Sequence, residues 1–285
     1  MSRLILRSPA KLNLFLKVIN KRPDGFHNIK TLFERIDLCD TIVLKANRTG
    51  AIHLACDHPA LRSAASNLVV RAARLLQDRY HVKVGVDIRL IKKIPVAAGL
   101  AGGSSNAATV LTGLNRLWSL GLSQPVLMRH GRSLGSDVPF FLAQTPWGLG
   151  TGRGDRIKPV KIPHRFWHLL IVPRLKIYSA EVFRGLNLQL TKTNDNVNIL
   201  IRHLLNNNIY KINSVLCNDL ETSICENCLR IRPIRKKISR LLDREVHFSG
   251  SGPSLFCMLP SRQEACRLSQ KLEKYYHRVY VVSSM

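Results

Sequence analysis

A glycine-rich segment in the middle of the chain contains the residue types that could bind a phosphate group. It reads IPVAAGLAGGSSNAA over residues 94–108, with glycines at 99, 102 and 103. Glycines let the backbone approach a ligand closely and point successive N–H groups into one concavity. The spacing fits neither a Walker loop, which ends in Gly-Lys-Ser/Thr, nor a Rossmann loop. We therefore predict a phosphate-binding loop of another kind, with a flexible turn before a buried helix as the alternative.

The residues on either side of this segment predict the strand and the helix that would position it. Residues 84–91 alternate apolar residues with others, as a half-buried strand does. Residues 107–118 repeat apolar residues at helical spacing and stop at Gly121. We expect Ser104 or Ser105 to cap this helix, whose N-terminal dipole would favour an anion.

A lysine and an asparagine share one face of a strand predicted near the start of the chain. Leucines at 12, 14 and 16 alternate with Lys11, Asn13 and Phe15. Because successive side chains of a strand point to opposite faces, Lys11 and Asn13 should lie together. The pair could contact a polar ligand, or it could simply face solvent.

Phe26 and His27 follow a turn signal, Arg-Pro-Asp-Gly at 22–25. An aromatic ring can stack on a planar base, and a histidine can form hydrogen bonds with its edge. Local core packing is the alternative for both residues.

Asp137 lies in a Gly-Ser-Asp-Val-Pro segment at 135–139, after a helix predicted over 126–134. Taken by itself, this aspartate would cap the next helix. Asn67 is likewise expected to cap a helix that ends near Arg79.

The rest of the chain interleaves strands and helices without a long run of β-α repeats, which indicates an α+β protein of two domains, 1–158 and 159–285. Glycines over 148–154 indicate a flexible connection, and residues 249–254 form a second glycine-rich loop. Further strands are expected over 36–38, 41–44 (around a Cys39–Asp40 turn), 169–172, 256–259 and 279–282, and further helices over 197–205, 215–220, 231–242 and 263–275.

The composition is strongly basic, with 44 Lys and Arg against 18 Asp and Glu and a formal net charge of +26. Such a balance attracts nucleic acids, membrane surfaces or polyanionic small molecules. No nucleic-acid-binding motif accompanies the charge, so we do not expect nucleic acid to be the main partner. No apolar run resembles a signal peptide or a membrane-spanning helix, and we expect a cytoplasmic protein.

The seven cysteines do not indicate a disulfide framework, because their number is odd and low for this length. Cys225 and Cys228 have the spacing of a zinc ligand pair, with Cys217 nearby, but no second pair follows. Reduced thiols without a metal are the expectation.

Together these motifs resemble the GHMP kinases, small-molecule kinases named after those for galactose, homoserine, mevalonate and phosphomevalonate. The resemblance runs through nearly the whole chain, is strongest to about residue 145, and is closest to the branch that acts on 4-diphosphocytidyl-2-C-methyl-D-erythritol. It rests on PAKLNL at 9–14, PDGFH at 23–27, TLF at 31–33, GLAGGSSNAA at 99–108, GSDVP at 135–139 and SGSGP at 249–253.

The resemblance implies a two-domain α+β fold with a ribosomal-protein-like N-terminal half, a ferredoxin-like C-terminal half and an active site in the cleft between them. The implied reaction is phosphorylation of the 2-hydroxyl of that substrate by ATP with Mg²⁺, in the non-mevalonate route to isoprenoid precursors. Another small alcohol, such as homoserine or mevalonate, is the alternative acceptor, although it gives Phe26 and His27 no flat ring to contact. A basic nucleic-acid-binding protein on a lapsed kinase scaffold is a more distant alternative.

The resemblance also assigns roles to individual residues. Asp137 would act as the general base, and Lys11 beside it would favour the charged forms. The residues expected to bind ATP are Pro95, Val96, Ala97, Ala98, Gly99, Leu100, Ala101, Gly102, Gly103, Ser104, Ser105, Asn67 and Lys92. Those expected to bind the other substrate are Asn13, Phe26, His27, Phe33 and Phe183, with phenylalanine at 26 where this branch usually has tyrosine. Ser105 is a candidate Mg²⁺ ligand, and no magnesium carboxylate is assigned.

Overall fold

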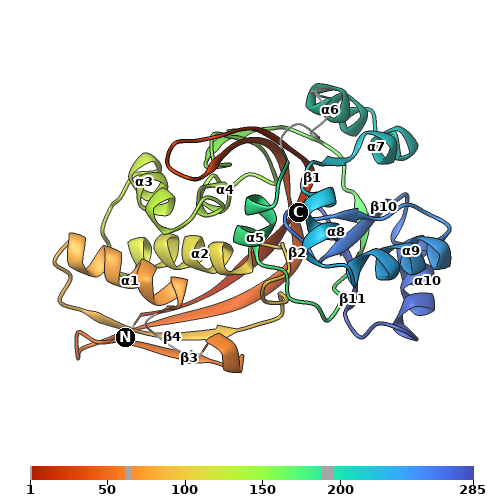
Figure 1. Ribbon diagram of the computed structural model, residues 1–285. Helices are drawn as coiled ribbons and strands as arrows, with labels where there is room; N and C mark the ends of the chain where they lie inside the picture. Colours follow the sequence, from red (N-terminus) through yellow and green to blue (C-terminus); the bar gives the residue numbers. More distant parts are fainter. Residues whose placement is uncertain (1, 62–65, 188–195) are drawn as a thin grey trace. The chain divides into compact units, whose positions relative to one another are not determined.

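The computed structural model describes residues 2–61, 66–187 and 196–285, which form two compact units (Figure 1). Unit 1 comprises Met1–Ala10, Leu38–Val96 and Ala101–Thr145, and unit 2 comprises Lys11–Asp37, Ala97–Leu100 and Pro146–Met285. Each unit combines strands with helices, so the predicted α+β class is confirmed. The predicted boundary at residue 158 stays a prediction, and each unit is assembled from three segments of the chain.

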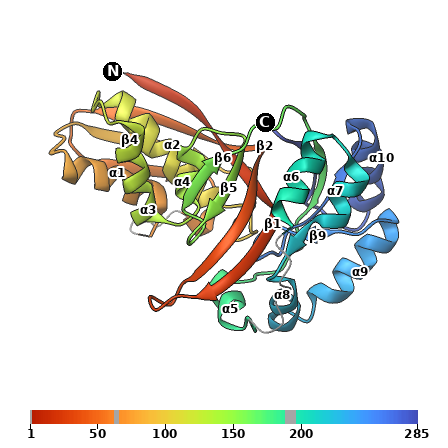
Figure 2. The same cartoon turned by 90° about the horizontal axis from the view of Figure 1, so that it is seen from above.

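Unit 1 is a sheet covered by helices. Its strands follow the order β3-β4-β2-β1, with α1 and α2 over one face of the sheet (Figures 1 and 2). Only part of β1 and part of β2 belong to this unit. The elements are β1 (Arg3–Lys21), β2 (His27–Asn47), β3 (Ile52–Cys56), a 3-10 turn (Pro59–Leu61), α1 (Leu68–Arg79), β4 (Gly85–Ile91), α2 (Gly102–Leu117), α3 (Gln124–Leu134) and α4 (Val138–Leu142).

The close fit of α2 on this sheet depends on a small residue in the helix. A Cβ on Gly113 would lie 2.5 Å from Leu44 of β2 and 2.6 Å from Leu6 of β1. The start of α1 is fixed as the sequence predicts, because the Asn67 side chain accepts a hydrogen bond of 3.0 Å from the Val69 N–H.

Unit 2 contains a four-stranded antiparallel sheet of order β11-β7-β10-β9, on which α10 packs. In this unit β2 also pairs with β5, β5 with β6, and β1 with β8. Figure 2 shows α6 beside α7, and α9 contacts α10. The elements are β5 (Trp147–Thr151), β6 (Arg156–Pro159), β7 (Trp167–Ile171), α5 (Ser179–Arg184), α6 (Val197–Leu205), α7 (Ile209–Val215), β8 (Cys217–Asn218), α8 (Glu221–Asn227), α9 (Ile231–Leu242), β9 (His247–Phe248), β10 (Leu255–Leu259), α10 (Arg262–Glu273) and β11 (Val279–Ser283).

The structure differs from the prediction in three segments, a turn, a helix and a flexible connection. The turn at Cys39–Asp40 does not form, because β2 continues through it and the buried Asp40 side chain is satisfied by hydrogen bonds. The helix over 215–220 is absent, because Asn218 pairs with β1 and donates its side-chain N–H groups to Phe248 and Gly250.

The third concerns the glycines of 148–154. They form strand β5 and a turn rather than a flexible connection, because residues 147–150 pair with Thr31–Glu34 of β2.

No helix among the described residues is long and apolar enough to cross a membrane. All seven cysteines are free thiols.

Candidate active site

The glycine-rich loop has the backbone conformation of an anion-binding concavity. Ala97, Gly99 and Ala101 have positive φ angles of 54°, 74° and 52°. Left-handed residues that alternate with others turn neighbouring N–H groups toward one point. The segment predicted to bind phosphate therefore has a geometry suited to it.

The helix α2 begins earlier than the sequence predicts. Ala101 is its N-cap residue and forms no side-chain cap, so the prediction that Ser104 or Ser105 caps the helix is wrong. Both serines lie within the first turn, because Gly102 and Gly103 are already helical. The first N–H groups of α2 thus receive no side-chain oxygen from the N-cap, and an anion at this position could bind them.

In unit 2 the carbonyl oxygen of Gly99 is fixed by two side chains. It accepts hydrogen bonds from Lys11 Nζ at 3.0 Å and from Ser249 Oγ at 3.1 Å. A Cβ on Gly99 would lie 2.2 Å from the carbonyl oxygen of Ser249. The two glycine-rich loops predicted from the sequence therefore lie against each other, backbone to backbone.

Lys11 and Asn13 lie together as predicted, and each is only 4% exposed, so the solvent-facing alternative is wrong. Lys11 Nζ donates to Asn13 Oδ1 and lies 5.6 Å from the centroid of the Phe33 ring. Asn13 Nδ2 donates to Thr31 Oγ1 at 2.8 Å. Phe33 is buried beneath Lys11, and a Cβ on Gly250 would lie 3.2 Å from Lys11 Nζ.

Ser105 points into unit 1. It is fully buried, and its Oγ lies 2.8 Å from Ser8 Oγ. Asn106 Nδ2 donates to Ser8 Oγ and to Asp40 Oδ2, both at 2.9 Å. The hydroxyl of Ser105 therefore belongs to an internal hydrogen-bond network.

Asp40 anchors the start of the glycine-rich loop and was not identified from the sequence. It is fully buried and forms an ion pair with Lys92, whose side chain is 5% exposed. Asp40 Oδ1 also accepts the backbone N–H groups of Lys93 and Ile94 at 2.8 and 2.9 Å. The ammonium group of Lys92, which was expected near ATP, therefore forms an ion pair with the buried carboxylate of Asp40.

Asp137 occupies the N-cap position of α4, but its side chain forms no capping hydrogen bond, so the capping alternative is wrong. Its turn lies close to the first turn of α2, because a Cβ on Gly135 would lie 3.8 Å from Ser104 Oγ. Unit 1 therefore brings the residues around Asp137 near the beginning of the helix that follows the glycine-rich loop.

The aromatic residues predicted to bind a planar base lie in unit 2, and two of them form a pair. His27 stacks on Phe183 with 5.3 Å between ring centroids and 29° between ring planes. Burial, and secondarily the charge of Lys21, lowers the pKa of His27, so its imidazole is neutral at neutral pH. Phe26 is 52% exposed, and the guanidinium carbon of Arg153 lies 4.9 Å from its ring centroid.

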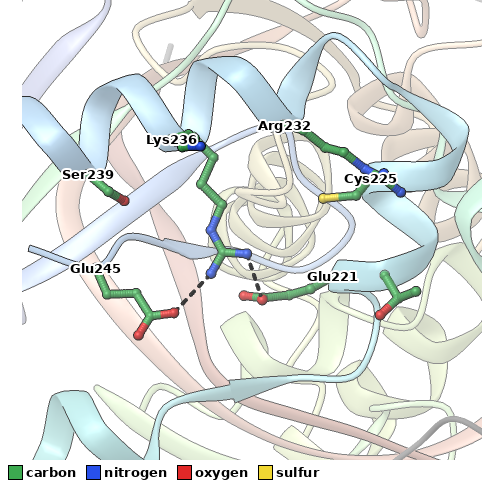
Figure 3. Close-up of a pocket in the computed structure, with 8 residues that line it drawn as sticks. Glu221, Cys225, Arg232, Lys236, Ser239 and Glu245 are labelled. Atoms are coloured by element: carbon green, nitrogen blue, oxygen red, sulfur yellow. Dashed lines mark hydrogen bonds and ion pairs between the residues drawn. The ribbon is translucent and has the colours of Figure 1, made fainter.

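A hollow in unit 2, of about 610 Å³, is lined by none of the residues predicted to bind ATP or the other substrate (Figure 3). Figure 3 shows Glu221 and Glu245 on its wall. Arg235 pairs with them at 3.0 and 3.2 Å. These two ion pairs connect α9 to α8 and to the segment that precedes β9.

Comparisons with known proteins point to one family. A model of the GHMP kinases N terminal domain matches residues 67–145. The 4-diphosphocytidyl-2-C-methyl-D-erythritol kinase of Bacillus subtilis is 38% identical over 280 residues, 98% of this chain and 96% of that protein. Its counterpart in Alkaliphilus oremlandii is 36% identical over 285 residues, 100% of this chain and 97% of that protein.

Solved structures agree with these relatives. A crystal structure of 4-(cytidine 5'-diphospho)-2C-methyl-D-erythritol kinase superposes with a TM-score of 0.85 at 29% identity, covering 99% of this chain and 100% of that chain. A homoserine kinase from Cytophaga hutchinsonii, 18% identical with a TM-score of 0.74, covers 100% of this chain and 95% of its own and shares the fold.

Proposed function

Because the chain belongs to the 4-diphosphocytidyl-2-C-methyl-D-erythritol kinases of the GHMP kinase family, we propose that it transfers the γ-phosphoryl group of ATP to the 2-hydroxyl of 4-diphosphocytidyl-2-C-methyl-D-erythritol. This is a step of the non-mevalonate route to isoprenoid precursors. The observation that supports it most directly is the glycine-rich loop, whose alternating left-handed residues suit a row of phosphates. A cytoplasmic location is part of the same proposal.

ATP would lie with its phosphates on residues 95–105 and at the N-terminus of α2. Backbone N–H groups there stabilise negative charge without a side chain. Lys11 adds a positive charge beside the loop, because its ammonium group donates a hydrogen bond to the Gly99 carbonyl oxygen. A cation held in a buried site is suited to the charge that accumulates on a phosphoryl group in transfer.

Asp137 is the proposed general base. Its carboxylate forms no helix cap, so it is available to accept the proton of the acceptor hydroxyl. As that proton moves to Asp137, the acceptor oxygen forms a bond to the γ-phosphorus. The bond between the γ-phosphorus and the β,γ-bridging oxygen breaks, and ADP leaves.

Mg²⁺ would reduce the charge on the transferring phosphates when it is bound with ATP. Ser105 does not fit a metal ligand as the structure stands, because its hydroxyl is buried and lies within hydrogen-bond distance of Ser8. Among the described residues no group of three His, Cys, Asp or Glu side chains could hold a metal ion. We therefore propose that ATP phosphates and water supply most of its ligands, as is common for Mg²⁺.

The cytosine ring is proposed to bind at Phe26, His27 and Phe183. A neutral His27 carries one donor and one acceptor, which suits the mixed donor and acceptor edge of cytosine. Phe26 offers an exposed face for stacking. Asn13, held beside Lys11, is the proposed polar contact to the sugar alcohol end.

The test is phosphate transfer from ATP and Mg²⁺, followed by mass spectrometry of three acceptors: the cytidyl diphosphate compound, homoserine and mevalonate. We expect phosphorylation of the first alone. Asp137→Asn should lower kcat by about 10²–10⁴-fold, and Lys11→Ala should lower it severely, because each loses a group that acts on the transferring atoms.

The matched control is Asp78→Asn, which changes an exposed carboxylate of α1 and should keep wild-type activity. Full activity in Asp137→Asn or Lys11→Ala would refute the role assigned to that residue. If wild-type enzyme phosphorylates homoserine or mevalonate instead, the assignment of the cytidyl diphosphate compound as the substrate is refuted.

A further inference from the structure

Arg153 lies at the tip of the β5–β6 hairpin, beside Phe26. Gly152 and Gly154, with φ of 67° and 87°, form the turn on either side of it. The hairpin is attached to the beginning of β2, because the Ile29 N–H donates to the carbonyl oxygen of Gly152 at 2.7 Å. This attachment keeps the guanidinium group 4.9 Å from the centroid of the Phe26 ring.

Asp155 orients Arg153 without enclosing it. Its Oδ1 accepts the backbone N–H of Arg153 at 3.1 Å, and its Oδ2 lies 3.4 Å from Nη2. The Arg153 side chain remains 26% exposed. A guanidinium group has five N–H donors in a planar fork, and this one contact uses a single nitrogen, so the fork can still take an oxyanion.

The other acidic group near Phe26 has a partner of its own. Asp24 forms a hydrogen-bonded ion pair with Arg22 at 2.8 Å. The hydrogen bond from Arg22 is the main reason why the pKa of Asp24 is lowered. Lys21 is close enough to His27 to contribute to lowering its pKa. Lys21 and Arg153 therefore put positive charge beside the exposed ring of Phe26.

We propose that Arg153 binds the diphosphate of the cytidyl substrate, so that it selects a nucleoside diphosphate over the free nucleoside. This inference depends on the proposed function, which puts cytosine at Phe26. A diphosphate is connected to its base through one ribose, and an arginine beside the stacking ring is within reach of it. Guanidinium and phosphate form short, charge-assisted and often bidentate hydrogen bonds.

The experiment compares wild-type enzyme with Arg153→Gln, using CDP and cytidine as separate probes in isothermal titration. We expect Arg153→Gln to weaken CDP binding by about 10–100-fold, the usual loss for hydrogen bonds to charged groups, and cytidine binding by less than about threefold. The KM of the cytidyl diphosphate substrate should rise with it, while kcat and the KM of ATP stay close to wild type. Arg153→Lys should recover part of the lost CDP affinity, since lysine keeps the positive charge but lacks the planar pair of N–H donors of a guanidinium group.

Arg156→Gln is the matched control, because it removes an exposed arginine from the same hairpin and should leave both affinities unchanged. Equal weakening of CDP and cytidine in Arg153→Gln would mean that Arg153 only holds the Phe26 ring, and unchanged CDP binding would also overturn the inference. In both cases wild-type transfer to the cytidyl substrate would leave the proposed function intact. A wild-type enzyme that binds neither probe and shows no transfer would refute both.

Discussion

At the scale of single residues, the site depends on a position where only a hydrogen atom fits. Gly99 has a φ of 74°, and a Cβ there would meet the carbonyl oxygens of Ser249 and Gly252 at 2.2 and 3.0 Å. Gly99→Ala should therefore lower the free energy of unfolding by about 2–4 kcal/mol, from left-handed strain and overpacking together. Activity should fall with it, because Lys11 and Ser249 both donate hydrogen bonds to this residue.

Chemical denaturation and kcat of the variant check this prediction. Gly103→Ala is the control, because its Cβ would lie 3.6 Å from the nearest atom, in Leu68, within helix α2. That change should be neutral or stabilise by up to about 1 kcal/mol. If Gly99→Ala is as stable as Gly103→Ala and as active as wild type, the packing of the two loops is not important for the site.

The sequence identified some of these residues and not others. Strand alternation was enough to put Lys11 and Asn13 on one face. Their burial was not predictable, because it comes from partners far along the chain, such as Gly99 and Thr31. Arg153 gave no signal either, since a glycine-rich turn does not indicate which surface its tip contacts.

At the scale of elements, the glycine-rich loop is connected to β2 through one carboxylate. Asp40→Asn keeps the shape of the side chain but leaves the ammonium group of Lys92 buried without a counter-charge. We expect a loss of about 3–5 kcal/mol in the free energy of unfolding. The KM of ATP should rise, because Asp40 also holds the N–H groups of Lys93 and Ile94.

Urea denaturation of a double-mutant cycle with Lys92→Met measures this coupling. Since Lys92→Met removes the charge that Asp40→Asn leaves unpaired, the double variant should be more stable than Asp40→Asn alone. A loss below about 1 kcal/mol in Asp40→Asn, or strict additivity in the double variant, would contradict the role given to Asp40.

The two long strands were predicted less accurately than the amphipathic helices α1, α6 and α9, and burial explains the difference. The bounds of α1, α6 and α9 agree with the apolar periodicity, because each helix buries one stripe only. The strands β1 and β2, of 19 and 21 residues, are much longer than their sequence pattern indicates. Both of their faces are buried in places, and polar residues such as Asp40 are satisfied inside, so the alternation is lost.

At the scale of the whole molecule, a buried histidine should make stability depend on pH. Burial lowers the pKa of His247 to about 4, whereas an unfolded histidine titrates near 6.5. The unfolded chain therefore binds a proton first as the pH falls. The free energy of unfolding should decrease by roughly 3 kcal/mol between about pH 6.5 and pH 4 from this residue.

Denaturant unfolding at several pH values, compared between wild type and His247→Asn, isolates this contribution. Other groups act in the opposite sense. Burial raises the pKa of Glu34, so this residue contributes most to stability at low pH. The contribution is lost as the pH rises above the pKa that Glu34 has in the unfolded chain. The difference between the two proteins removes such common contributions. If wild type and His247→Asn lose stability in parallel on acidification, His247 is not the cause.

The sharing of β1 and β2 between the two units determines how the protein can emerge from the ribosome. Every segment of unit 1 has been synthesised once Thr145 is added. Unit 2 is completed later, because Asp37, in its part of β2, accepts a hydrogen bond from the backbone N–H of Ser283. The roughly 140 intervening residues take about 7–28 s to translate at typical rates of about 5–20 residues per second. During that interval the nascent chain holds the beginning of unit 2 without its last partners, and strand edges in this state are open to pairing with other chains. Slow translation of the second half would therefore lengthen the period in which the chain depends on chaperones.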